Sequence, residues 1–127
     1  MITIKDFRKL KVWNIAHQVT LAVYKATAKF PREELYGLTS QIRRCSASVA
    51  ANIAEGCGRR GNAEFNRFLQ ISSGSASELD YHLLLARDLG SLTVLEHRNL
   101  VQPLSELRRM LSALILKIDA DRGLAKC

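Results

Sequence analysis

The sequence contains few of the residues that interrupt helices. Two prolines and seven glycines are few among 127 residues, and aromatic residues make up only 6%. The low aromatic content argues against a β-sandwich, and the abundance of leucine and alanine favours helices. A chain of this length with 47% hydrophobic residues has enough material for one core. This composition favours a single all-α domain over residues 1–127.

Long apolar runs are also missing. The first residues contain no apolar run of the length that a signal peptide needs. No later segment reaches the roughly 18 consecutive apolar residues of a membrane span. We therefore expect a cytoplasmic protein that has no membrane partner.

Cysteine and histidine do not form a recognisable metal or catalytic motif. The chain has three cysteines, which is an odd number, and they are widely spaced: Cys45, Cys57 and Cys127. They form no C-x-x-C pair, and the three histidines do not cluster in the sequence. We interpret the cysteines as reduced thiols. The chain has no Glu-x-x-His motif of a di-iron bundle, no Ser-His-Asp set and no phosphate loop. The sequence thus predicts no metal, no cofactor, no small-molecule substrate and no enzymatic activity.

Apolar residues instead recur at three- and four-residue steps, which is the period of an amphipathic helix. The predicted helices cover residues 9–29, 34–55, 62–89 and 93–119, each bound being approximate. The three connections between them are short. Four such helices predict an up-down-up-down antiparallel four-helix bundle.

Local signals mark the helix ends. Pro31 stops the first helix, and glycines between residues 56 and 61 separate the second from the third. Gly90 is placed to end the third helix, and Thr93 with Glu96 has the form of a capping box. Pro103 conflicts with the fourth helix because it removes a backbone donor, so we expect either a kink near Asn99 or a restart at Gln102.

Two polar stripes lie beside the apolar faces of the second and third helices. Their members are Gln41, Arg44, Ser48, Asn52 and Glu55 on one helix, and Ser75, Glu78 and His82 on the other. In antiparallel helices these stripes would meet, and we expect Arg44 and Glu78 to form a partly buried ion pair that fixes register. We interpret the stripes as a structural polar network. The alternative is that Glu55, Glu78 and His82 catalyse a reaction or bind a metal.

Positive charge is concentrated in the first half of the chain. Residues 1–67 contain 12 Lys and Arg against five acids, whereas residues 68–127 contain seven of each, so the first part accounts for the whole net charge of +7. The candidate phosphate contacts are Arg43, Arg59, Arg60 and Arg67. Arg59 and Arg60 are the best candidates because a glycine-rich turn leaves them free to reach out. The alternative is a solvated surface without a function.

Several motifs together carry a resemblance to a known family. They are Phe7–Leu10, Trp13, Phe30-Pro31, Tyr36-Gly37-Leu38, Gln41–Arg44, Asn52–Gly56, Glu64-Phe65, Gly74-Ser75, Glu78-Leu79 and Met110-Leu111. Over nearly its whole length the chain resembles the four-helix-bundle proteins encoded within intervening sequences of bacterial 23S ribosomal RNA genes. It departs from that family at Cys57, where a large apolar residue is usual, and at Ser73, where a basic residue is common.

This resemblance implies a homopentamer with no established enzymatic activity. A more distant similarity, to the accessory proteins of diversity-generating retroelements, implies binding to nucleic acid. We therefore expect a self-associating protein that binds structured RNA or DNA through a basic surface, the alternative being an oligomeric scaffold or protein-interaction module with no nucleic-acid role. A second apolar set on the first helix independently favours self-association, and its members are Val12, Ile15, Ala22 and Phe30.

Overall fold

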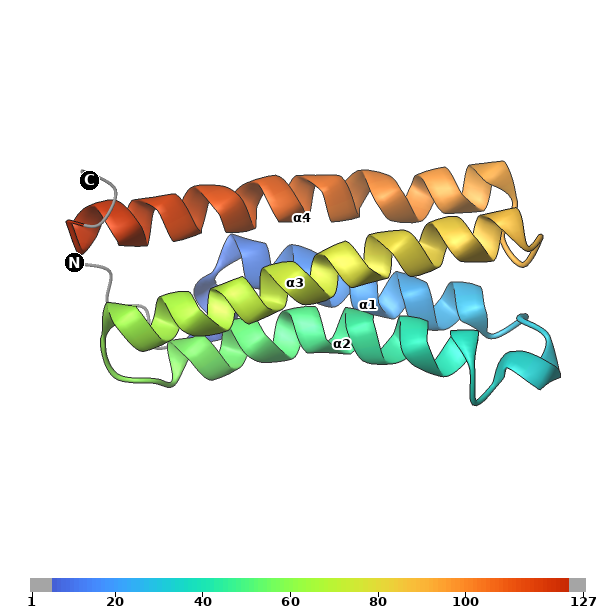
Figure 1. Cartoon of the computed structure of the whole chain (residues 1–127), viewed down its shortest axis with the longest axis horizontal. Helices are drawn as coiled ribbons and strands as arrows, with labels where there is room; N and C mark the ends of the chain where they lie inside the picture. Colours follow the sequence, from blue (N-terminus) through green and yellow to red (C-terminus); the bar gives the residue numbers. More distant parts are fainter. Residues whose placement is uncertain (1–5, 124–127) are drawn as a thin grey trace.

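The computed structural model of the chain describes residues 6–123, which form four long helices (Figure 1). No strand occurs within these residues. The prediction of an all-α fold with four helices is confirmed. The helices are α1 (Lys11–Thr27), α2 (Leu38–Cys57), α3 (Gly61–Asp88) and α4 (Val94–Asp121), with short 3-10 helices η1 (Phe7–Lys9) before α1 and η2 (Arg32–Glu34) before α2.

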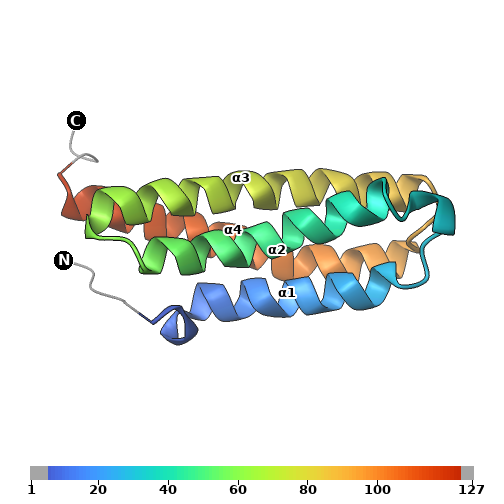
Figure 2. The same cartoon turned by 90° about the horizontal axis from the view of Figure 1, so that it is seen from below.

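Hydrogen bonds between helices show how neighbouring helices are oriented. Along each pair of consecutive helices, the residue numbers of the contacting partners rise on one helix as they fall on the other, so the two helices are antiparallel (Figure 2). The contacting pairs are Thr20–Ser46, Thr27–Arg43, Ser48–Ser75, Val49–Ser72, Asn66–Asp119 and Asp80–Arg108. Over residues 6–123, α1 and α3 do not approach within 8 Å at their Cα atoms, nor do α2 and α4. Each helix therefore packs against two others.

The core lies along the axis between the four helices. On α4, Leu100, Leu104, Leu107 and Leu111 are at most 5% exposed, as their three- and four-residue spacing predicts. Burying such a side chain stabilises the fold by about 1.5–3 kcal/mol. No helix in the described part of the chain combines the length and apolar content needed to cross a membrane.

The second helix begins later than its sequence indicates. We expected it to start near Glu34, but that residue ends η2 and α2 begins at Leu38. The physical reason is Gly37, whose φ of −113° and ψ of −112° lie outside the helical region. Every other helix end lies within two residues of its predicted position.

The fourth helix is continuous through Pro103. A restart at Gln102 is therefore wrong, because one helix extends from Val94 to Asp121. At its beginning, the Glu96 amide donates to Thr93 Oγ1 (3.1 Å) and the Thr93 amide donates to Glu96 Oε1 (2.8 Å). The predicted capping box is confirmed.

Two glycines hold positions that a larger residue would disturb. A Cβ atom on Gly56 would lie 3.0 Å from both Phe65 Cδ1 and Phe68 Cβ, so the missing side chain permits α2 and α3 to approach closely. Gly90 has a φ of +83°, and the amide that follows it donates to the Ala86 carbonyl (2.9 Å). This left-handed residue closes α3 where the sequence predicted its end.

Candidate functional sites

Three of the four predicted phosphate-contacting arginines lie together at the α2–α3 turn. Arg59 and Arg60 are exposed in the turn, and Arg67 is exposed on the first part of α3. The guanidinium carbons of Arg67 and Arg59 lie 4.5 Å and 5.1 Å from the centroid of the Phe68 ring. The ring thus holds two of these cations in place by cation–π contacts. We call Arg59, Arg60 and Arg67 the arginine cluster.

Two carboxylates accompany the arginine cluster. Arg67 Nε donates to Glu64 Oε2 (2.8 Å), and Arg59 Nη2 lies 3.6 Å from Glu55 Oε2. The hydrogen bond from Arg67 lowers the pKa of the Glu64 carboxyl group. Within residues 6–123, Arg60 has no ion pair within 4.0 Å. Exposed pairs of this kind contribute little to stability, so an anion can displace the carboxylates at small cost.

Arg43 lies away from the arginine cluster. It occupies the other end of α2, about 20 Å along the helix from the turn. Its Nε donates to Thr27 Oγ1 (2.8 Å), and its guanidinium carbon lies 4.9 Å from the centroid of the Tyr24 ring. The structure therefore uses Arg43 to join α1 to α2 and does not place it with the other three candidates.

Some of the polar residues predicted on α2 and α3 meet between the two helices. Ser48 Oγ and Ser75 Oγ are 2.9 Å apart, and Asn52 Nδ2 donates to Ser48 Oγ (2.9 Å). Glu55 does not join them, because its carboxylate points to Arg59 at the surface. The predicted stripe is thus divided between an interhelical group and an exposed ion pair.

The predicted ion pair between Arg44 and Glu78 is wrong. Arg44 is exposed, and its guanidinium donates to the Gln41 side chain one turn earlier on α2. The Glu78 carboxylate turns instead toward Cys45 and His82. Each partner finds a nearer group, so the charge pairing that the spacing suggested does not form.

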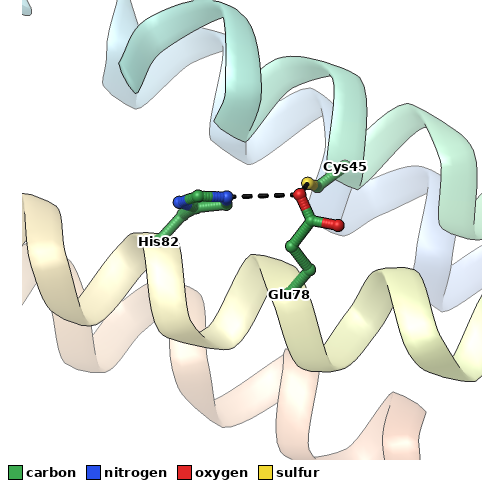
Figure 3. Close-up of side chains that lie close together, drawn as sticks. All are labelled: Cys45, Glu78 and His82. Atoms are coloured by element: carbon green, nitrogen blue, oxygen red, sulfur yellow. Dashed lines mark hydrogen bonds and ion pairs between the residues drawn. The ribbon is translucent and has the colours of Figure 1, made fainter. Parts of the chain in front are cut away.

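Cys45, Glu78 and His82 form a compact cluster between α2 and α3 (Figure 3). Cys45 Sγ donates to Glu78 Oε2 (3.0 Å), and His82 Nε2 lies 3.3 Å from the same oxygen. Cys45 is buried, the His82 side chain is 17% exposed and the Glu78 side chain is 51% exposed. We call these residues the Cys–Glu–His cluster.

The protonation states in the Cys–Glu–His cluster follow from burial and from these bonds. Burial, reinforced by the bond to Glu78, raises the pKa of the Cys45 thiol to about 12. The bonds from Cys45 and His82 lower the pKa of the Glu78 carboxyl group. The sequence grouped Glu78 with His82 but missed Cys45, because that residue belongs to the apolar stripe of another helix.

The other cysteines form no such cluster. Cys45 and Cys57 are both free and buried, in agreement with the predicted reduced thiols. Burial raises the pKa of Cys57 to about 11. Cys127 lies outside the described residues.

An apolar groove of about 520 Å³ lies between α1 and α4. Its lining residues are Lys11, Asn14, Ile15, Gln18, Val19, Ala22, Leu100, Pro103 and Glu106. Of the second apolar set predicted on the first helix, Ile15 and Ala22 line this groove, but Val12 and Phe30 are buried in the core. The surplus apolar surface is therefore smaller than the sequence suggested and is centred on the groove.

These features define the described part of the chain as an all-α, four-helix protein with a basic turn and an apolar groove at its surface. Residues 8–113 match the family described as 23S rRNA-intervening sequence protein. The chain belongs to this family, which confirms the resemblance inferred from the Asn52–Gly56 segment and the motifs around it.

A solved structure shares the fold. It is the crystal structure of a protein of unknown function from the S23 ribosomal protein family of Bacteroides thetaiotaomicron, with a TM-score of 0.74. The two chains are 22% identical, and the match covers 82% of this chain and 97% of that one. At this identity the likeness shows the fold alone. No curated protein matches the chain.

Proposed function

We propose that the protein is a non-enzymatic, self-associating RNA-binding protein that contacts phosphates through the arginine cluster. The observation that carries this proposal is the exposure of three arginines at one turn, in the half of the chain that holds the whole excess of positive charge. The family's description names 23S rRNA, and this makes structured RNA the first ligand to test. Duplex DNA is the second.

The geometry of the arginine cluster suits a phosphate backbone. Guanidinium groups bind phosphate oxygens through paired hydrogen bonds. Because the Phe68 ring already restrains the side chains of Arg59 and Arg67, less side-chain entropy is lost when they bind a phosphate. Arg60 contributes a charge that is free of ion pairs among residues 6–123. Such binding is electrostatic and therefore weakens as salt is added.

The non-enzymatic part of the proposal rests on where the candidate catalytic groups lie. Glu55 pairs with Arg59 at the surface, whereas Glu78 contacts Cys45 and His82 between the helices. The two carboxylates considered for a joint catalytic site are thus engaged with different partners.

We propose that each protomer is an up-down-up-down bundle and that five protomers form a ring, as the family resemblance implies. The apolar groove between α1 and α4 supports self-association because apolar surface of this kind is usually covered by a partner. Five copies of a chain with a charge of +7 would repeat the arginine cluster around the ring. Weak phosphate contacts then add through multivalency.

A charge-reversal experiment tests the RNA proposal. The double variant Arg59→Glu/Arg60→Glu is compared with Arg98→Glu/Arg109→Glu, which changes the net charge equally at exposed positions of α4. Binding to a structured 23S rRNA fragment should weaken more than tenfold in the first variant and at most a few-fold in the second. Equal losses would assign binding to net charge alone, and no binding by the unaltered protein would reject the proposal.

The second candidate function is an oligomeric scaffold or protein-interaction module with no nucleic-acid role. The apolar groove favours it, because that surface could bind a protein without help from the arginines. This function predicts an intact oligomer that binds neither RNA nor DNA at low salt. Salt-dependent RNA binding that requires Arg59 and Arg60 would count against it.

A further inference from the structure

The Cys–Glu–His cluster brings together three side chains that are common metal ligands. Cys45 comes from α2, and Glu78 and His82 lie one turn apart on α3, so their side chains share a face of that helix. Cys45 Sγ, a carboxylate oxygen of Glu78 and a ring nitrogen of His82 all lie within 4.8 Å of one another. Figure 3 shows all three pointing to one place between the helices.

Two of these separations are close to those that one zinc ion would impose. Zinc binds sulfur at about 2.3 Å, and nitrogen or oxygen at about 2.0–2.2 Å, in a tetrahedral arrangement. Such bonds place sulfur about 3.6 Å from oxygen, and nitrogen about 3.4 Å from oxygen. The observed distances are 3.0 Å from Sγ to Oε2 and 3.3 Å from Nε2 to Oε2. Small side-chain movements would therefore admit the ion.

Charge and burial also suit a divalent ion. A thiolate and a carboxylate together neutralise Zn²⁺, and a neutral complex is tolerated beside a buried residue such as Cys45 far better than a charged one. Glu78 is half-exposed, so the ion would have a path from solvent and an open side. Mixed sulfur, nitrogen and oxygen donors are typical of zinc among the divalent cations.

We propose that Cys45, Glu78 and His82 bind one Zn²⁺ per protomer, joining α2 to α3 and leaving a fourth position for water. Cys45 Sγ gives up its proton to solvent as the Zn–S bond forms, and His82 binds through the lone pair of neutral Nε2. The Glu78 carboxylate exchanges its bond from the thiol for a bond to the metal.

Sequence motifs would not have revealed the complete site, although Glu78 and His82 are candidate metal ligands in the alternative interpretation of the polar stripes. Its cysteine lies 33 residues before Glu78, and neither a C-x-x-C pair nor an H-x₃-H pair is present to announce it. The sequence therefore predicted no metal, whereas the fold assembles the ligands from two helices.

Cobalt provides a direct test, because Co²⁺ occupies zinc sites and its bond to a thiolate produces a charge-transfer band in the near ultraviolet. The full-length protein, reduced and freed of metal by a chelator, is titrated with Co²⁺ and then with Zn²⁺. We expect one Co²⁺ per protomer, the charge-transfer band, the release of one proton, and displacement of cobalt by zinc. Zinc should also raise the midpoint of thermal unfolding.

Variants assign the ligands. Cys45→Ser should abolish the band, and Glu78→Gln and His82→Gln should each weaken binding at least tenfold. Cys57→Ser, Cys127→Ser and His97→Gln are the matched controls and should bind as the unaltered protein does. Far-ultraviolet circular dichroism reports whether each variant is folded. If Cys45→Ser does not fold, the loss of metal affinity in Glu78→Gln still tests the site.

Failure to bind one equivalent of either metal would overturn the proposal. A band that survives Cys45→Ser, or that is lost equally in Cys57→Ser, would also overturn it. These results do not depend on RNA binding, so the zinc site and the proposed function can fail separately.

Discussion

At the scale of single residues, Cys45 and Glu78 control each other's protonation. The buried thiol donates its hydrogen to the carboxylate, so the carboxylate keeps its charge and the thiol keeps its proton. The pKa of Cys45 rises to about 12, from 9.0 for an ordinary thiol. In the metal-free protein Cys45 is therefore a poor nucleophile at neutral pH.

Replacing Glu78 should make Cys45 more reactive. In Glu78→Gln the thiol loses its charged acceptor while its burial, the larger cause of the raised pKa, remains. We expect alkylation of Cys45 by iodoacetamide in chelator at pH 8 to accelerate by about tenfold or less. Mass spectrometry of the modified peptides measures the rates. Cys57 is the internal control, and an unchanged Cys45 rate, or an equal change at both thiols, would contradict the account.

The same carboxylate should contribute to the pH dependence of stability. The folded-state pKa of Glu78 lies below its usual 4.5, so the stabilisation that it provides is present above pH 4.5 and is lost as the pH falls through the lower, folded-state value. We expect Glu78→Gln to be less stable than the unaltered protein at pH 7, with the difference closing in acid. Urea unfolding at several pH values measures it, and a constant difference would exclude this linkage.

The arginines show which residue-level features can be predicted from sequence. The exposed turn that contains Arg59 and Arg60 could be predicted, because the glycines around these arginines indicate a turn. The partner of Arg43 could not be predicted, because it depends on the rotation of α2 against α1. Arg44 does not pair with Glu78, because the Glu78 carboxylate is bonded to Cys45 and His82. The Thr27 hydroxyl group accepts a hydrogen bond from Arg43. The Gln41 side chain accepts one from Arg44, in place of the expected ion pair with Glu78.

At the scale of helices, the close contact of α2 with α3 depends on Gly56. A Cβ atom there would lie 3.0 Å from the side chains of Phe65 and Phe68, which are both buried. We expect Gly56→Ala to destabilise the protein by about 1–3 kcal/mol because the helices must separate. Urea unfolding followed by circular dichroism measures this loss.

Gly74→Ala is the matched control for that variant. Gly74 lies within α3 and is exposed, and an added Cβ would meet no atom within 4 Å. Alanine there should stabilise the protein by about 0.5–1 kcal/mol, since glycine is unfavourable inside a helix. Equal effects of the two substitutions would show that helix propensity, and not the contact at Gly56, determines the outcome.

Helix ends could be predicted where one local signal decides them. Gly90 and the capping box of Thr93 and Glu96 fix the connection from α3 to α4 through their own backbone bonds. The start of α2 could not be predicted, because the acidic residues that resemble a helix start instead form η2, and Gly37 delays the helix to Leu38. A short 3-10 turn and an α-helix begin with the same sequence signals.

At the scale of the whole molecule, the apolar groove is the proposed surface for self-association. Ala22 lines it and is exposed, so a glutamate there should leave the fold intact and place a charge in the interface. We expect the unaltered protein to be a homopentamer and Ala22→Glu to dissociate it, as native mass spectrometry would show. Ala113→Glu, an exposed position of α4 that does not line the groove, should remain pentameric.

A monomeric unaltered protein, or a pentamer that tolerates Ala22→Glu, would contradict this use of the groove. Neither result would affect the four-helix fold. The fold follows from the helical period of the apolar residues, whereas the number of copies in an assembly depends on the shape of a surface that periodicity does not describe.

The salt dependence of RNA affinity tests directly whether the arginine cluster binds RNA. The slope of log K against log salt counts the phosphates that the protein contacts, and neutralising one contacting arginine should reduce it by about one. We predict a steep slope for the unaltered protein and a clearly shallower one for Arg59→Gln/Arg60→Gln/Arg67→Gln, with Arg98→Gln/Arg109→Gln unchanged. An identical slope in the unaltered protein and the triple variant would show that the arginine cluster does not bind RNA.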